Sequence, residues 1–225
     1  MARSPTDARE TAPEPKAPAR RRRAPAMDKG ERRRSILDAA LAEFSAHGFA
    51  GARLDDVARR AGVAKGTLYL YFSDKQALFR GLVEETLSPV LVDAGGMVAL
   101  FPGDTRDLLD LLIELLAQRV LETPAQALVR LMIAEGPRFP ELAAYYHREV
   151  VVRGLALIRA IVARGIARGE IDSDIPARFP QLVIAPAIVA VVWNGMFGAF
   201  DPLDVRQFLA AHRDMILRGL GWRET

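Results

Sequence analysis

Residues 62–79 read GVAKGTLYLYFSDKQALF, which are two short helical segments with almost nothing between them. The first follows Gly62-Val63, covers about residues 64–72 and displays lysine, threonine and tyrosine side chains that a buried helix does not need. Ser73 followed by Gln76 is the pattern of a capping box, so a further helix is expected over residues 73–87. The sequence therefore predicts a short surface helix with a polar outer face, directly followed by another helix.

Two more helices precede this pair. Glycine commonly follows a helix end, and Gly48 and Gly62 each follow a group of apolar residues at helical spacing. The first group is Ile36, Leu37, Ala40, Leu41 and Phe44, and the second is Leu54, Val57, Ala58 and Ala61. Since so few residues separate the second helix from the third, these two helices must cross steeply, as in a helix-turn-helix.

Small and apolar residues fall where such a crossing needs them. Ala58 allows the two helices to approach closely, and Gly62 can take the positive φ that the turn requires. We expect Leu68, Leu70 and Phe72 to point into the shared core.

The remaining face of the third helix fits the major groove of DNA, where a helix is read from its N-terminal residues. Lys65 lies there, and Gly66 costs about 1 kcal/mol relative to alanine, which is reasonable if the backbone must come very close to DNA. Lys75, in the first turn of the next helix, opposes the helix dipole and is expected to serve phosphate binding rather than folding. Hydrogen bonds to phosphate are expected from Thr67, Tyr69 and Tyr71.

Residues 32–79 resemble the DNA-binding domain of the TetR family of bacterial transcriptional regulators. Helices two to four of that family read close to DDIA…AGVSKGTLYYHFxSKexL, and residues 55–79 here read DDVARRAGVAKGTLYLYFSDKQALF. The resemblance implies an all-α fold: an N-terminal three-helix DNA-binding domain with a helix-turn-helix, and a larger C-terminal helical domain for ligand binding and dimerisation. It places Lys65 and Gly66 nearest the bases, and Thr67, Tyr69 and Lys75 on phosphates.

Three positions depart from the family pattern. Arg53 stands where serine or threonine commonly caps helix two, and it can reach a phosphate instead of capping. Ala64 replaces the usual serine at the start of helix three, and Tyr71 replaces a frequent histidine while keeping a DNA-facing position.

Charge and composition divide the chain into three parts. Residues 1–80 hold 17 Lys and Arg against 10 Asp and Glu, whereas residues 81–225 hold 14 against 18, so the front half attracts polyanions. Residues 1–27, rich in Pro, Ala and Arg, are expected to be a disordered basic arm. Its Arg20–Arg23 cluster either adds attraction to phosphate or belongs to a solvated leader. Residues 28–75 are the expected DNA-binding domain, and residues 76–225 the expected effector-binding and dimerisation domain.

The C-terminal part reads as helices separated by proline and glycine, without strand alternation. The expected helices cover residues 108–121, 125–134, 149–168, 182–200 and 205–220. Residues 181–200, QLVIAPAIVAVVWNGMFGAF, are uncharged and as long as a membrane span, about 20 residues, but a subunit interface produces the same pattern. TetR-family proteins dimerise by pairing their last two long helices. The resemblance assigns this role to residues 149–168 and 182–200, with Ala190, Gly195, Gly198 and Ala199 permitting close packing.

The expected function is a homodimeric repressor in the bacterial cytoplasm, on the nucleoid when bound to DNA. It would read a palindrome in double-stranded DNA with recognition helices about 34 Å apart. By resemblance, a small apolar or amphipathic ligand would release it. Residues that either line the ligand cavity or simply pack in the core are Phe101, Met132, Trp193, Asn194, Met196 and Phe197.

Other classes of function have less support. The chain has no cysteine and only three histidines, none paired at ligand spacing, so no metal or cofactor is expected. No arrangement of catalytic residues stands out, and an enzyme is not expected. Two alternatives remain: a DNA-binding protein tethered to a membrane by residues 181–200, and an enzyme or small-molecule carrier that kept the fold and lost DNA binding.

Overall fold

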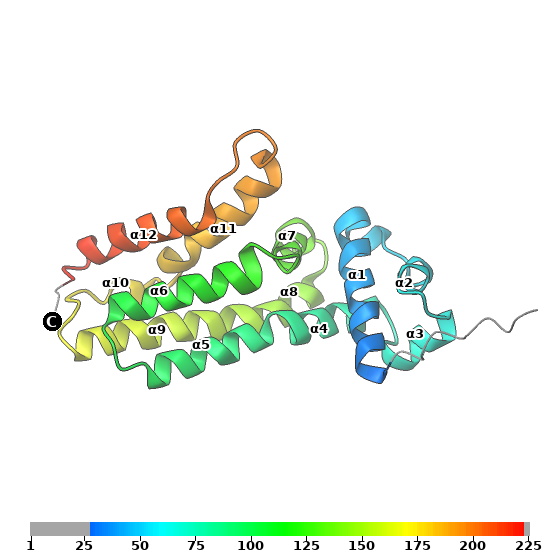
Figure 1. Ribbon diagram of the computed structural model, residues 1–225, viewed down its shortest axis with the longest axis horizontal. Coiled ribbons are helices and arrows are strands. Elements are labelled where there is room, and N and C mark those ends of the chain that lie inside the picture. Colours follow the sequence, from blue (N-terminus) through cyan, green and yellow to red (C-terminus); the bar gives the residue numbers. More distant parts are fainter. Residues whose placement is uncertain (1–27, 223–225) are drawn as a thin grey trace, which may run out of the picture.

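The computed structural model describes residues 28–222, and every regular element in that range is a helix (Figure 1). The prediction of an all-α fold is confirmed, while the predicted arm, residues 1–27, lies outside the described residues. The small domain contains α1 (Lys29–Gly51), α2 (Leu54–Arg60) and α3 (Lys65–Tyr71). The remaining elements are α4 (Lys75–Thr86), α5 (Ser88–Leu100), α6 (Thr105–Leu116), the π-helix η1 (Ala117–Leu121), α7 (Gln126–Glu135), α8 (Pro140–Tyr146), the π-helix η2 (His147–Val151), α9 (Val152–Ala167), α10 (Ile175–Arg178), α11 (Gln181–Phe197) and α12 (Val205–Gly219).

Helix α1 begins with a capping box and is interrupted at its predicted end. The Asp28 carboxylate accepts a hydrogen bond from the Gly30 backbone N–H, and the Glu31 carboxylate accepts one from the Asp28 backbone N–H. Gly48 has a φ of 67° and a non-helical conformation, so the last residues of α1 turn away from its axis. The apolar face of α1 packs on α2 and α4, and it shares one buried cluster with Leu68 of α3, which is fully buried.

One sequence-based prediction about the following helices is wrong. The N-cap of α4 is Asp74, whose carboxylate accepts from the Ala77 backbone N–H at 2.7 Å, while the Ser73 hydroxyl donates to that same carboxylate. A carboxylate next to the serine is an equally good capping acceptor and moves the cap one residue on. Further along the chain, Gly95 and Gly96 lie inside α5, because packing of α5 against α4, α6 and α9 outweighs the low helix propensity of glycine.

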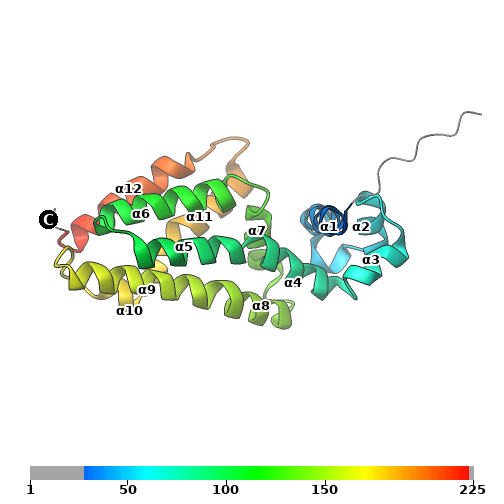
Figure 2. The same ribbon diagram turned by 60° about the horizontal axis from the view of Figure 1, so that its bottom comes forward.

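The larger domain is an elongated bundle reached through α4, which runs from the small domain into it (Figure 2). Helix α5 packs on α6 and α9, and α12 packs on α6 and α11. The last two long helices of the chain are α11 and α12, and they pack on each other (Figure 1). The predicted dimer interface of residues 149–168 and 182–200 stays a prediction, because packing within one chain does not test contacts between subunits. Within the chain, α9 packs on α5 and α10.

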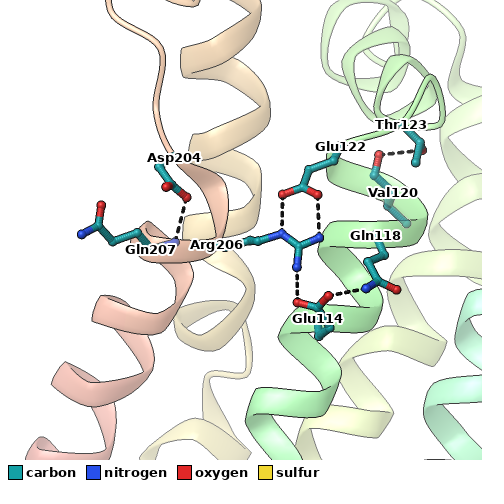
Figure 3. Close-up of polar contacts among 8 residues, drawn as sticks. All are labelled: Glu114, Gln118, Val120, Glu122, Thr123, Asp204, Arg206 and Gln207. Carbon is teal, nitrogen blue, oxygen red and sulfur yellow. Dashed lines mark hydrogen bonds and ion pairs between the residues drawn. The ribbon is translucent and has the colours of Figure 1, made fainter.

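An ion-pair cluster fixes the first turn of α12 to the end of α6 (Figure 3). Arg206 donates two parallel hydrogen bonds to the Glu122 carboxylate, both at 2.8 Å, and a further one to Glu114. These hydrogen bonds hold the pKa of Glu122 below its usual range. Arg206 therefore connects Glu114, which precedes η1, to Glu122, which follows η1. This π-helix leads to α7.

Helix α7 and the start of α8 contact the small domain, and α8 also contacts α4, the helix that connects the two domains. Helix α7 packs on α1, and the ring of Phe49 lies 4.9 Å from that of Phe139, between α7 and α8. Helix α4 packs on α8, where the Tyr145 hydroxyl donates to Glu84 at 3.1 Å. Movement within the larger domain can thus reach the small domain through α7 and through α8.

Candidate nucleic-acid interface

The turn between α2 and α3 has the geometry that the sequence predicts. Gly62 has a φ of 68°, and the Val63 backbone N–H donates to the Ala58 carbonyl at 3.0 Å. Ala58 is 3% exposed and Leu68 is 0% exposed, so both lie in the core shared by the crossing helices. The predicted helix-turn-helix is confirmed.

The face of α3 opposite Leu68 contains Gly66 and Leu70. These two residues are one helical turn apart, and both are exposed. The prediction that Leu70 belongs to the core is wrong, because a residue two positions from Leu68 points to the other side of a helix. Phe72, at 3% exposure, does lie in the core as predicted. The outer ridge of α3 is therefore a glycine followed by a protruding leucine.

Lys65 starts α3 with an exposed ammonium group that already has an internal partner. Its Nζ lies 2.7 Å from Oδ1 of Asp55, in the first turn of α2, and the two side chains are 60% and 45% exposed. The hydrogen bond from Lys65 holds the pKa of Asp55 low, and Asp55 raises the pKa of Lys65. Asp55 is a participant that the sequence did not single out, and a phosphate approaching Lys65 would have to compete with it.

The other predicted DNA-contacting side chains lie around this ridge. Tyr69 is 45% exposed, Arg53 is exposed, and Thr67 and Tyr71 are half-buried. Arg53 is the N-cap residue of α2, and no side chain caps that helix. The side chain of Arg53 therefore has no capping role, as expected, and its contact with phosphate stays a prediction.

Lys75 has a structural role that its position in the sequence did not reveal. Its Nζ donates to the carbonyl oxygens of Phe49 at 2.8 Å and Ala50 at 2.9 Å, and it lies 5.2 Å from the centre of the Phe49 ring. Carbonyl groups at a helix end lack partners within the helix, so a cation there is favourable. Lys75 thus fastens α4 to the end of α1, contrary to the expectation that it does not help folding. Its phosphate contact stays a prediction.

The predicted ligand-binding residues do not gather around one cavity. The Trp193 indole N–H donates to the Asp201 carbonyl at 2.8 Å, and the Asn194 amide exchanges two hydrogen bonds with the Leu203 backbone, so both hold the loop between α11 and α12. Met196 and Phe197 are exposed, and Met132 on α7 is half-buried. Phe101 follows α5, where its carbonyl accepts from Arg164 of α9.

A small apolar cavity in the larger domain lies elsewhere, between α6, α9, α10, α11 and α12. Its volume is about 30 Å³. Ligand sites are usually roughly 300–1,000 Å³, so this cavity is too small for a ligand in the present conformation. Its lining residues are Thr105, Leu109, Ile158, Ile161, Val162, Ile171, Pro176, Val183, Ile216, Leu217 and Leu220.

A steep helix-turn-helix with an exposed second helix, carried by a larger helical bundle, defines a DNA-binding transcriptional regulator. The model for bacterial regulatory proteins of the tetR family matches residues 36–82, and the model for the tetracyclin repressor-like C-terminal domain matches residues 102–211. The chain belongs to the TetR family, and it is a regulator rather than an enzyme.

Individual relatives agree with this assignment over most of their length. The chain is 33% identical to the HTH-type transcriptional repressor SCO4008 of Streptomyces coelicolor, over 70% of this chain and 77% of that one. It is 27% identical to the HTH-type transcriptional regulator AcrR of Shigella flexneri, over 83% and 90% respectively. Its fold is similar to that of the fatty acid degradation regulator FadR from Bacillus halodurans, with a TM-score of 0.74, 22% identity and coverage of 88% and 100%.

No helix within residues 28–222 has both the length and the apolar character needed to span a bilayer. The uncharged segment forms α11, which has 17 residues and contains Pro186. These findings do not favour the alternative of a membrane anchor over residues 181–200.

Proposed function

We propose that the protein is a homodimeric repressor that binds a palindromic operator and is released by a small apolar or amphipathic ligand. The observation that carries this proposal is the outer surface of α3. A cation, a glycine, the exposed Tyr69 and the half-buried Tyr71 lie there on the second helix of the helix-turn-helix, and Lys65 is 60% exposed. In this proposal Lys65 and Gly66 lie against the bases, and phosphates are contacted by Arg53, Thr67, Tyr69, Tyr71 and Lys75.

A gel-shift experiment on the protein's own promoter region tests operator binding. The wild-type protein should bind with a strong dependence on salt, because each phosphate contact releases a counterion. The combined substitution of Lys65→Ala, Thr67→Ala and Tyr69→Ala should abolish the shift, whereas Lys29→Ala, an exposed lysine at the start of α1, should not. Binding that survives the triple substitution would refute this use of α3.

For the dimer, the support is an apolar stripe on α11. Leu182, Val189 and Met196 recur every seven residues and are 50%, 47% and 62% exposed. Such a stripe is the seam of two packed helices, and a second copy of the same surface is its simplest partner. We propose that α11 and its neighbour α12 form the subunit interface and thereby set the spacing of the two recognition helices.

Light scattering after size-exclusion chromatography tests the interface. The wild-type protein should have twice the 24.7 kDa mass of one chain. Val189→Asp should give a monomer, while Val92→Asp, at a valine of α5 that is 62% exposed, should leave the dimer intact. A wild-type monomer at micromolar concentration would contradict the proposal.

For the ligand, the support is the small apolar cavity between α6, α9 and α12. We propose that the ligand enters by spreading these helices, and that the displacement of α6 passes through η1 and α7 to α1. The hydrogen bonds of Arg206 to Glu114 and Glu122 connect α12 to the residues on both sides of η1. Since the ligand needs only to prefer the conformation that does not bind DNA, the operator must weaken ligand binding by the same factor.

Tryptophan fluorescence can report this event, because Trp222 packs on the apolar cluster next to the cavity and the chain has only one other tryptophan, Trp193. In Trp193→Phe, binding of the ligand should change the remaining signal. Val183→Phe, which fills the cavity, should prevent release from DNA without changing operator affinity. Normal release in Val183→Phe would refute this location.

A further inference from the structure

Leu70 is a large apolar side chain on the outside of the recognition helix. It is 85% exposed, although α3 belongs to a small domain whose other large apolar residues are mostly buried. Single exposed leucines are common on protein surfaces and need no explanation by themselves. The surroundings of Leu70, however, restrict what it can contact.

The first restriction is geometric. Leu70 lies one turn after Gly66, on the side of α3 opposite the buried Leu68. A Cβ built at Gly66 meets no atom within 4 Å, so this glycine has no packing function inside the protein. One turn before Leu70, the backbone of α3 at Gly66 is therefore not covered by any side chain. A partner can approach this backbone closely while it also contacts the leucine.

The second restriction is electrostatic. The positive charges of Lys65, Arg53 and Arg59 all act on the Asp55 carboxylate, so three cations lie near the base of α3. Lys65 and Arg59 are 60% and 77% exposed. Exposed cations near the start of α3, together with an apolar side chain further along the same helix, do not complement an apolar protein partner, but they do complement a groove flanked by phosphates.

Within the major groove, an aliphatic side chain can distinguish only one group on the base edges. Thymine presents a C5-methyl group there, and the other base edges present hydrogen-bonding groups. We propose that Leu70 is a specificity-determining residue that reads a thymine methyl group in each half of the operator. This inference rests on the proposed operator binding and adds the identity of one base that the protein prefers.

The test uses the operator selected by the wild-type protein from random duplex DNA. Each thymine of the half-site is replaced in both halves by deoxyuridine, which removes the methyl group and leaves every hydrogen-bonding group in place. Affinities are measured by fluorescence anisotropy at one salt concentration for wild-type, Leu70→Ala and Leu100→Ala. Leu100, at the end of α5, is 83% exposed and serves as the matched control.

For the wild-type protein, deoxyuridine at one particular thymine should weaken binding by about fourfold for each methyl group, or about fifteenfold for both half-sites. The affinity of Leu100→Ala should fall by the same factor when deoxyuridine replaces that thymine. Leu70→Ala should bind the two DNAs equally, and it should have the wild-type thermal midpoint because the side chain is exposed. Leu70→Met, which keeps an apolar tip, should retain the preference.

Three results would overturn the inference. A loss at that thymine that persists in Leu70→Ala would assign the methyl contact to another residue. Equal affinity of the wild-type protein for all deoxyuridine duplexes would mean that no methyl group is read. Failure of the wild-type protein to select any duplex would refute the proposed function, and the inference with it. This outcome is distinguished from failure of the inference alone, because selection by the wild-type protein is measured first.

Discussion

Gly66→Ala should stabilise the protein and weaken its binding to DNA, which are effects of opposite sign. Gly66 is the second residue of α3, it is exposed, and its φ is not positive. A Cβ at this position meets no atom within 4 Å. Since neither backbone conformation nor packing requires glycine, its presence has to be explained by something outside the chain.

The expected magnitudes follow from this environment. Alanine is favoured over glycine in a helix, so the free energy of unfolding should rise by about 0.5–1 kcal/mol. For a chain of this size that corresponds to an increase in the thermal midpoint of about 1–4 °C. In a palindromic complex two added methyl groups meet the DNA, and we expect the operator dissociation constant to rise at least about tenfold, or 1.4 kcal/mol.

The measurements are thermal unfolding at a fixed protein concentration and operator titration by anisotropy. Gly96→Ala is the matched control, because Gly96 is an exposed glycine within α5 whose Cβ would also meet no atom within 4 Å. It should show the same gain in stability with unchanged operator affinity. If Gly66→Ala bound the operator as tightly as Gly96→Ala does, the backbone of α3 would not lie against the bases, and the reasoning would fail.

Three further predictions concern charged and buried groups. Asp55→Asn should tighten binding to operator and unrelated duplexes alike, by up to about fivefold at low salt and less at high salt, in titrations at two ionic strengths, because Lys65 is no longer neutralised. Glu170→Gln should lower the free energy of unfolding in urea by about 2–3 kcal/mol at neutral pH, since the fully buried Glu170 carboxylate accepts hydrogen bonds from the Thr105 backbone, its hydroxyl and Arg168. Burial alone would raise the pKa of Glu170, but these hydrogen bonds outweigh it and lower the pKa, so the difference from wild-type should shrink as pH falls below 4.5. Burial raises the pKa values of Tyr145 and Tyr146 from 10.0 to about 12, so ultraviolet titration should show two late-ionising phenols, of which Tyr146→Phe removes one. Tyr146 alone should lower stability between these pH values by up to about 3 kcal/mol.

The fold of the small domain was largely predictable, because the sequence features that determine it lie close together in the chain. The spacing of apolar residues gives three helices, and the turn demands a residue such as Gly62 that accepts positive φ. Leu70 was misplaced for an avoidable reason, since helical geometry alone puts it opposite Leu68. The cap of α4 was misplaced by one residue because Ser73 and Asp74 are both good capping residues, and the sequence does not say which one bonds to the helix.

The rest was not predictable because it depends on residues far apart in the chain. Lys75 contacts carbonyls at the end of α1, about 25 residues earlier, and only the folded structure brings them together. The ligand-binding candidates were selected for apolar character near α11. The structure instead uses Trp193 and Asn194 to hold a loop, and it lines its apolar cavity with residues of α6, α9, α10 and α12 and with Val183 near the start of α11.

Three features of α3 are unfavourable or unused in the free protein, and a single partner explains all of them. A glycine weakens the helix, a leucine is left in water, and a lysine is neutralised by a neighbouring carboxylate. A protein partner could cover the leucine but would not require the glycine or the excess of cations. In the proposed complex, a duplex groove would approach Gly66 closely, would offer a methyl group to Leu70 and would replace Asp55 with an acceptor group of a base at Lys65. The three features therefore have to be tested together, since loss of the effect at any one of them weakens the case for the other two.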